Sequence, residues 1–155
     1  MQIPKYILEI NENKSPVLVS EQFVELDSGK ITEAVIAVEI AEKFYNLSRM
    51  GEEHIIILGL LSGKLISTFR LSHGTYNMAY TSPRELFIRL LLSGCGEFIL
   101  LHNHPSGSIE ASKEDMLTCN RVNMAAELMG IKMLDFIIVA SGGKAYYSFK
   151  EAELL

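Results

Sequence analysis

The chain has 155 residues, of which 48% are hydrophobic and 21% charged, a balance typical of a folded domain with one core and not of a disordered chain. Its formal net charge of −5, without any run of Lys or Arg, argues against non-specific binding to duplex DNA. No stretch reaches the ~20 apolar residues of a membrane span and the N-terminus lacks an apolar signal region, so we expect a soluble, cytoplasmic protein with no membrane partner.

The first thirty residues contain two short β-like runs, 6–8 and 17–19, separated by a turn-rich segment. They predict either an extended arm or an edge hairpin. From Ile31 apolar residues recur at three-residue steps, which indicates a helix that we expect to end near Met50 and Gly51.

Two strands should follow this helix. Residues 54–61 are nearly all aliphatic, which is typical of a strand covered on both faces. The pair Ser62 and Gly63 then predicts a tight turn into a second strand over 65–71. These two strands should form a hairpin.

The next helix has clear start and stop signals. Ser82 stands at a cap position with Pro83 at the first helical position, and Gly94 ends the apolar stretch. Residues 98–101 then predict a third buried strand.

The last third of the chain begins with a turn-rich segment, residues 102–111. A helix from about Ser112 to Met129 and strands over 133–140 and 145–149 should follow it. Strands interleaved with three helices predict an α/β fold with a mixed sheet sandwiched by helices. Because no internal repeat or linker is present, we expect residues 1–30 to be an N-terminal arm or hairpin and residues 31–155 a single domain.

The two cysteines, Cys95 and Cys119, are too few and too far apart for a disulfide scaffold or a CxxC metal site. They are expected to be small buried hydrophobic residues in a reducing compartment.

His102 and His104 stand two residues apart where a buried strand ends. In an extended backbone their side chains point to the same side of the sheet. Ser112 and Asp115, at i and i+3 of a helix start, share one face of its first turn. A catalytic zinc needs about three N or O ligands and an open position for water, and His102, His104 and Asp115 meet that requirement.

A purely structural interpretation fits the same residues. Ser112 to Asp115 is also a capping box in the broad sense, and the segment from His102 to Gly107 is also a polar turn. The spacing alone leaves both interpretations open.

The run His102-Asn103-His104-Pro105-Ser106-Gly107, followed by Ser112-Lys113-Glu114-Asp115, resembles the signature of the JAB/MPN (JAMM motif) metalloenzyme family, specifically its bacterial RadC-like branch. The resemblance extends from about Glu39 to the C-terminus and includes Gly74-Thr75, Pro83-Arg84-Glu85, Glu53 with residues 55–60, and residues 146–149. It implies a JAB/MPN-like mixed sheet between helices, with cytidine-deaminase-like layering.

The resemblance also implies roles for single residues. His102, His104 and Asp115 would be ligands of Zn²⁺, Ser112 would steady an oxyanion, and Glu53 would be the general base. Glu52 competes for the last role, but strand alternation sends the two carboxylates to opposite faces and the register of the family favours Glu53. By contrast, His54 and His73 have no partner at ligand spacing and are expected to be ordinary surface or strand residues.

Two positions depart from the pattern of the family. Ala111 replaces the usual proline before the motif serine. This change should only remove the restriction that proline places on the unfolded loop, which is worth up to about 1 kcal/mol of stability. Phe136 follows Asp135 where the family commonly has histidine. This change removes a polar group that would orient a ligand or substrate, so it bears on activity more than on metal binding.

The resemblance implies zinc-dependent hydrolysis of amide or isopeptide bonds in a protein or peptide substrate, in the manner of a metallopeptidase. A metal-dependent nuclease or DNA-repair-associated protein is the second hypothesis, because the branch is linked to DNA repair by name. The tripeptide of residues 102–104 does not support it, since HNH nucleases take those residues from separated positions. The thirty residues ahead of Ile31 are also too short for the helix-hairpin-helix module of longer members, so the sequence does not support a DNA partner.

A third hypothesis is a non-catalytic metal-binding interaction module. Phe136 favours it, whereas Glu53 and Ser112 oppose it. The sequence gives neither the substrate nor the oligomeric state.

Overall fold

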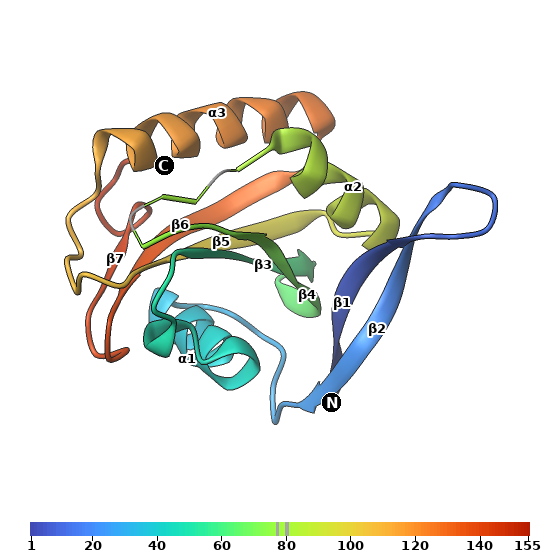
Figure 1. The fold of residues 1–155 in the computed structure, drawn as a ribbon, viewed down its shortest axis with the longest axis horizontal. Helices are drawn as coiled ribbons and strands as arrows, with labels where there is room; N and C mark the ends of the chain where they lie inside the picture. The colour runs from blue at the N-terminus through green and yellow to red at the C-terminus, as the bar shows by residue number, and fades with distance from the viewer. Residues whose placement is uncertain (77, 80) are drawn as a thin grey trace.

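The computed structural model describes residues 1–76, 78–79 and 81–155. Strands and helices within these residues are interleaved along the chain (Figure 1). In order they are β1 (Gln2–Ile10), β2 (Pro16–Glu25), α1 (Ala34–Tyr45), the short 3₁₀ helix η1 (Leu47–Arg49), β3 (His54–Leu61), β4 (Lys64–His73), α2 (Pro83–Ser93), β5 (Glu97–His104), α3 (Lys113–Met129), β6 (Lys132–Ala140) and β7 (Tyr146–Ser148).

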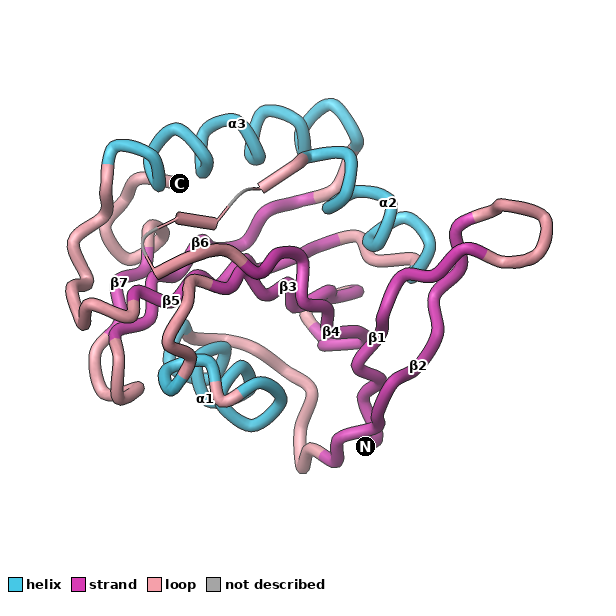
Figure 2. Tube along the Cα trace, in the orientation of Figure 1, coloured by secondary structure: helices cyan, strands magenta, loops and turns pink. Residues whose placement is uncertain are grey.

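The strands form one seven-stranded sheet in the order β2-β1-β4-β3-β5-β6-β7. Two neighbouring pairs, β1 with β4 and β5 with β6, are parallel and the others are antiparallel, so the sheet is mixed. Helix α1 lies on one face, and α2 and α3 lie on the other (Figure 2). The predicted α/β sandwich is therefore confirmed.

The central strands are apolar on both faces because each face is covered by helices. In β3, Ile56 and Leu58 pack on the α1 side with Ala37 and Val38. The alternate residue Ile57 packs on the other side, where α3 contributes Val122 and α2 contributes Leu90. The long aliphatic run that predicted a doubly covered strand has this two-sided burial as its physical cause.

The turn between β3 and β4 also follows the prediction. Ser62 and Gly63 both have positive φ, 52° and 72°, which is the conformation that a two-residue hairpin turn of right-handed twist requires. The strands pair in antiparallel fashion from Leu61 with Lys64 to His54 with His73.

Helix α1 ends earlier than the predicted Met50 or Gly51. Asn46 takes the left-handed conformation, with φ at 48°, and its backbone N–H donates to the Glu42 carbonyl. The Glu42 carboxylate then accepts from the backbone N and the hydroxyl of Ser48, at 2.7 and 2.9 Å. These contacts turn the chain into η1 and replace the last predicted turn of the helix.

Helices α2 and α3 begin and end within one residue of the prediction, and Gly94 and Gly130 follow them with positive φ. Strand β5 is longer than expected. Residues 102–104 were predicted to open a turn, but they continue the strand and pair with residues 138–140 of β6. The polar character of these residues suggested a turn, but all three side chains are buried in the strand.

Residues 1–30 contain the β1–β2 hairpin at the edge of the sheet, and its turn extends beyond the rest of the structure (Figure 1). It joins the sheet through a short parallel pairing of Lys5 and Tyr6 with Thr68 and Phe69 of β4. The division of the chain at residue 30 stays a prediction. Among the described residues, no helix combines the length and the apolar character that a membrane span needs.

Candidate metal centre

Strand β5 places His102 and His104 on the same side of the sheet, as the two-residue spacing predicts. His102 pairs with Ile55 of β3 and with Ile138 of β6, so backbone hydrogen bonds hold it on both sides. Both imidazoles are buried, and their ring centroids are 4.9 Å apart. The sheet therefore presents two adjacent imidazoles to the space beneath α3.

The first turn of α3 faces these histidines. Ser112 caps the helix, since its hydroxyl oxygen accepts from the backbone N of Asp115 at 3.0 Å. In return the Asp115 Oδ2 atom accepts from the backbone N and the hydroxyl of Ser112, at 2.8 and 2.7 Å. The capping box that the sequence left as an alternative is present, and it fixes the Asp115 carboxylate toward the histidines.

Asp115 approaches both imidazoles. Its Oδ1 is 3.7 Å from His102 Nδ1, and its Oδ2 is 3.4 Å from His104 Nε2. His104 Nδ1 lies 3.0 Å from the Ser108 carbonyl oxygen, to which it donates. Because Nδ1 is used in this way, Nε2, on the side of Asp115, is the nitrogen that would bind a metal ion in place of its proton.

Glu53 completes the group from the segment that precedes β3. It is only 8% exposed, and its Oε2 is 3.3 Å from His102 Nε2. The neighbouring Glu52 points away and contacts His73 at the surface. The five residues proposed from the sequence, Glu53, His102, His104, Ser112 and Asp115, thus lie together, and Glu52 lies outside.

The donors fit a zinc ion. Glu53, His102 and His104 each offer one ligand atom, and these atoms lie within 4.8 Å of one another, with the Asp115 carboxylate against both imidazoles. His102 Nε2 is buried and has no hydrogen-bond partner among the described residues. Such an unpaired buried nitrogen is costly unless something coordinates it, and two imidazoles with carboxylates are a common zinc donor set.

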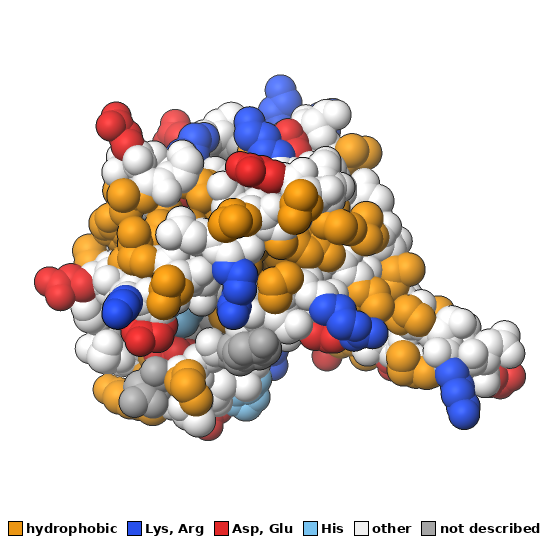
Figure 3. Space-filling model, turned by 90° about the horizontal axis from the view of Figure 1, so that it is seen from above, with side chains coloured by type: hydrophobic (Ala, Val, Ile, Leu, Met, Phe, Trp, Pro, Cys, Tyr) orange, Lys and Arg blue, Asp and Glu red, His pale blue; other side chains and the backbone are white. Residues whose placement is uncertain are grey.

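The centre opens into a groove of about 470 Å³. Tyr76, Met78, Glu110 and Glu114 are among the residues that line it. Viewed from the α3 side, acidic side chains lie next to a histidine on this face (Figure 3). No Lys or Arg is among the described lining residues, so the groove carries negative charge.

Burial raises the pKa of Asp115, but hydrogen bonds with His104 and Ser112 outweigh it and lower that pKa from 3.8 to about 2. The same contact with Asp115 raises the pKa of His104 against the opposite effect of burial. In the metal-free protein the two groups therefore favour each other's charged forms.

This ion pair predicts how the stability of the metal-free protein depends on pH. Because the pKa of Asp115 is lowered on folding, its contribution to the free energy of unfolding is present above pH 3.8 and is lost as the pH falls toward 2. We expect urea unfolding of the metal-free wild type to show an acid loss of stability that Asp115→Asn lacks. Curves for the two proteins that run parallel from pH 5 to 2.5 would contradict this account of the carboxylate.

His54 and His73 were predicted to have no partner at ligand spacing, and this is wrong. With Glu52 they form a second group whose ligand atoms lie within 4.8 Å of one another, because the two histidines face each other across β3 and β4. However, their rings stack at 4.5 Å with an angle of only 12° between the planes. Their in-plane lone pairs therefore run side by side and do not converge on one ion.

Phe136 lies directly beside the centre. Its ring is 6.5 Å from the His102 ring and 4.9 Å from that of Phe149, and it is fully buried. On this side His102 therefore has an apolar neighbour, and the Phe136 side chain offers its imidazole no hydrogen bond.

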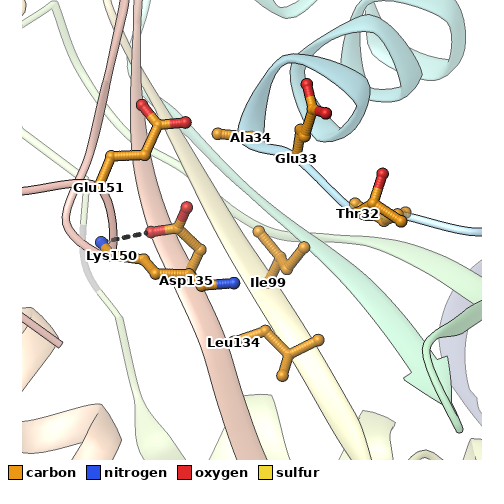
Figure 4. A pocket seen from close by; sticks show the side chains of 9 residues that line it. Thr32, Glu33, Ala34, Ile99, Leu134, Asp135, Lys150 and Glu151 are labelled. Atoms are coloured by element: carbon orange, nitrogen blue, oxygen red, sulfur yellow. Dashed lines mark hydrogen bonds between the residues drawn. The ribbon is translucent and has the colours of Figure 1, made fainter.

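Asp135, by contrast, has a structural role on the α1 side. It accepts from the Ser148 hydroxyl and from the backbone N of Lys150, at 2.6 and 3.0 Å. Asp135 lines a separate pocket near the start of α1, together with Glu33 and Lys150 (Figure 4). Both predicted cysteines are buried and free, as expected.

Two contributors to the centre were not found from the sequence. The Ser108 carbonyl orients His104, and nothing in the sequence indicates it because every residue has a carbonyl. Gly74 pairs with the Glu53 backbone, and a Cβ atom there would lie 1.8 Å from the Met78 carbonyl oxygen. Glycine at this position was visible in the sequence, but its contact partner was not.

Comparison with known proteins gives one family. The family model described as RadC-like JAB domain matches residues 30–154. A UPF0758 protein of Trichlorobacter lovleyi is 35% identical over 76% of this chain and 51% of its own length. A UPF0758 protein of Streptococcus suis is 30% identical over 95% of this chain and 56% of its own length. The chain therefore spans about half the length of these curated relatives.

Proposed function

The chain belongs to the RadC-like JAB domain family, and from this premise we propose that it is a zinc-dependent hydrolase of amide or isopeptide bonds in peptides or proteins. The observation that carries the proposal is the buried group of Glu53, His102, His104 and Asp115 at the floor of one groove. Ionisable residues are rarely buried together without a functional partner.

His102, His104 and Asp115 are the residues proposed to hold the ion, and Glu53 is proposed as the general base. Zinc bound there would supply an acidified water, with a pKa near 7, and polarise a carbonyl group. The Glu53 carboxylate, beside His102 Nε2, is placed to accept a proton from a molecule in the groove and to return it to a leaving nitrogen. No covalent intermediate is required.

Ser112 lines the same groove and is proposed to stabilise the oxyanion. Its hydroxyl holds one proton, which it now donates to Asp115. Stabilising an oxyanion requires the hydroxyl to turn this proton toward the groove, while its oxygen still caps α3. The role therefore predicts that Ser112 acts on turnover and also, more weakly, on metal affinity through Asp115.

The charge of the groove supports a peptide over a nucleic acid. Glu110 and Glu114 at the rim, with a net charge of −5 for the chain, disfavour the phosphate backbone, whose binding depends on cations. Tyr76 and Met78, which are 60% and 67% exposed, offer apolar contact to a substrate side chain.

One comparison of substrates distinguishes the peptidase, the nuclease and the interaction module. The zinc-loaded protein is incubated with a fluorogenic peptide panel, with a lysine isopeptide and with duplex DNA at low salt, where DNA has its best chance to bind. We expect zinc-dependent hydrolysis of an amide substrate and no cleavage of DNA. Ser112→Ala should lower amide turnover by about a hundredfold or more, the usual effect of losing one oxyanion donor.

Ser93→Ala is the matched control, because Ser93 ends α2 and, among the described residues, its hydroxyl bonds only to its own helix and to Cys95. It should keep wild-type turnover. Zinc-dependent DNA cleavage that disappears in Glu53→Gln would favour the nuclease. Firm zinc binding without any hydrolysis would favour the interaction module, for which Phe136 beside His102 is the structural argument.

A further inference from the structure

We propose that Asn103, the residue between the two histidines, positions Glu53. Strand alternation sends the Asn103 side chain to the face opposite His102 and His104, and the residue is only 1% exposed. Asn103 is not among the described residues that line the groove, so we assign it a positioning role and no contact with substrate. The inference rests on the proposed function only for the role of Glu53 as a base.

The side-chain amide of Asn103 forms hydrogen bonds with the segment that carries Glu53. Its Oδ1 accepts from the backbone N of His54 at 2.7 Å. Its Nδ2 donates to the carbonyl oxygens of Glu52, at 3.0 Å, and of Met50, at 3.4 Å. The two residues that flank Glu53 are therefore held by one side chain.

These bonds extend the sheet by one step beyond its backbone ladder. The pairing of β3 with β5 stops at Ile55 and His102. Beyond this point the Asn103 amide supplies the acceptor and the donor that a strand backbone would offer to residues 52 and 54. Backbone groups of consecutive residues point to opposite edges of a strand, so those of Glu53, between residues 52 and 54, point the other way.

On that other edge, the Glu53 backbone N donates to the Thr75 carbonyl and its carbonyl oxygen accepts from the Gly74 backbone N, both at 2.8 Å. The backbone of Glu53 is thus fixed from two sides. Asn103 completes the arrangement. Of three consecutive residues in β5, His102 and His104 place their imidazoles on one face of the sheet, and Asn103, on the other face, holds the two residues that flank Glu53. The Glu53 carboxylate is thereby held beside His102.

The test uses the metal-free protein and needs no substrate. The ring proton resonances of His102 report the carboxylate of Glu53, whose Oε2 is 3.3 Å from His102 Nε2. Glu53→Gln sets the reference shift. Asn103→Asp keeps the size and the acceptor but loses both donated bonds, and Asn103→Ala removes all of these hydrogen bonds. Leu101→Val is the matched control, because Leu101 is a buried β5 residue on the same face that packs only in the core.

We expect both Asn103 variants to move the His102 resonance in the direction of Glu53→Gln by at least half of that reference shift, while Leu101→Val leaves it in place. The His54 amide should exchange at least about tenfold faster in Asn103→Ala, as for one lost hydrogen bond. An Asn103 variant with fast His54 exchange and an unmoved His102 resonance would overturn the proposal.

If neither Asn103 variant folds, a measurement on the wild-type protein still tests the hydrogen bonds of Asn103. A scalar coupling between the His54 amide nitrogen and the Asn103 side-chain carbonyl is expected, and its absence would contradict these bonds. Because these readouts involve no hydrolysis, an inactive wild type would overturn the proposed function and leave the inference on Asn103 standing.

Discussion

Glu53→Gln is expected to lower amide hydrolysis by about a hundred- to ten-thousandfold, the range of a lost general base, while the protein keeps its zinc. Glutamine has nearly the same size and can still fill the space beside His102, so the fold and the proposed ligands His102, His104 and Asp115 remain. Only the ability to accept a proton at this point of the groove is lost. The measurement pairs turnover with the metal content of the same sample.

Glu52→Gln is the control for this variant, since it makes the same change one residue earlier. Glu52 is exposed and contacts His73 on the opposite side of the sheet. We expect Glu52→Gln to keep wild-type turnover. Loss of turnover in Glu52→Gln with full turnover in Glu53→Gln would refute the assignment of the base.

His104→Ala is expected to weaken zinc binding by more than about a hundredfold, because changes in the hydrogen-bond partners of a ligand alone weaken it by about 10–100-fold. The variant removes an imidazole whose Nδ1 is already held by Ser108 and whose Nε2 faces Asp115. His73→Ala removes a histidine outside the centre and should keep wild-type affinity. Zinc titrations of the two variants give the comparison, and equal affinities would place the ion elsewhere.

Much of the fold followed from local patterns. The aliphatic run of β3, the turn at Ser62 and Gly63, and the glycines that end α2 and α3 are each determined by residues close in sequence. The predicted end of α1 was wrong because the Glu42 carboxylate accepts hydrogen bonds from Ser48, six residues later. Helical periodicity does not encode that contact.

The extent of β5 was also underestimated, and the reason is functional. His102, Asn103 and His104 are polar, so they resemble the start of a turn, yet all three are buried. A hydrophobic pattern detects strands whose burial serves packing. It misses strand residues that are buried because they form a polar centre.

The centre itself divides in the same way. The spacing made His102, His104 and Asp115 candidates because it places side chains on a common face of one strand or one helical turn, and the family resemblance then favoured a metal site over a capped polar turn. The contributions of Ser108, Gly74 and Asn103 depend on which backbone groups meet after folding. The sequence contains these residues, but not the register that brings them together.

The metal content of the purified wild-type protein, determined by elemental analysis after reconstitution with zinc and removal of free ions, tests the central claim most directly. The account predicts about one tightly bound zinc per chain, retained in Glu53→Gln and lost in His104→Ala. A wild-type protein that binds no transition metal after reconstitution, or one whose zinc is unaffected by His104→Ala, would contradict it.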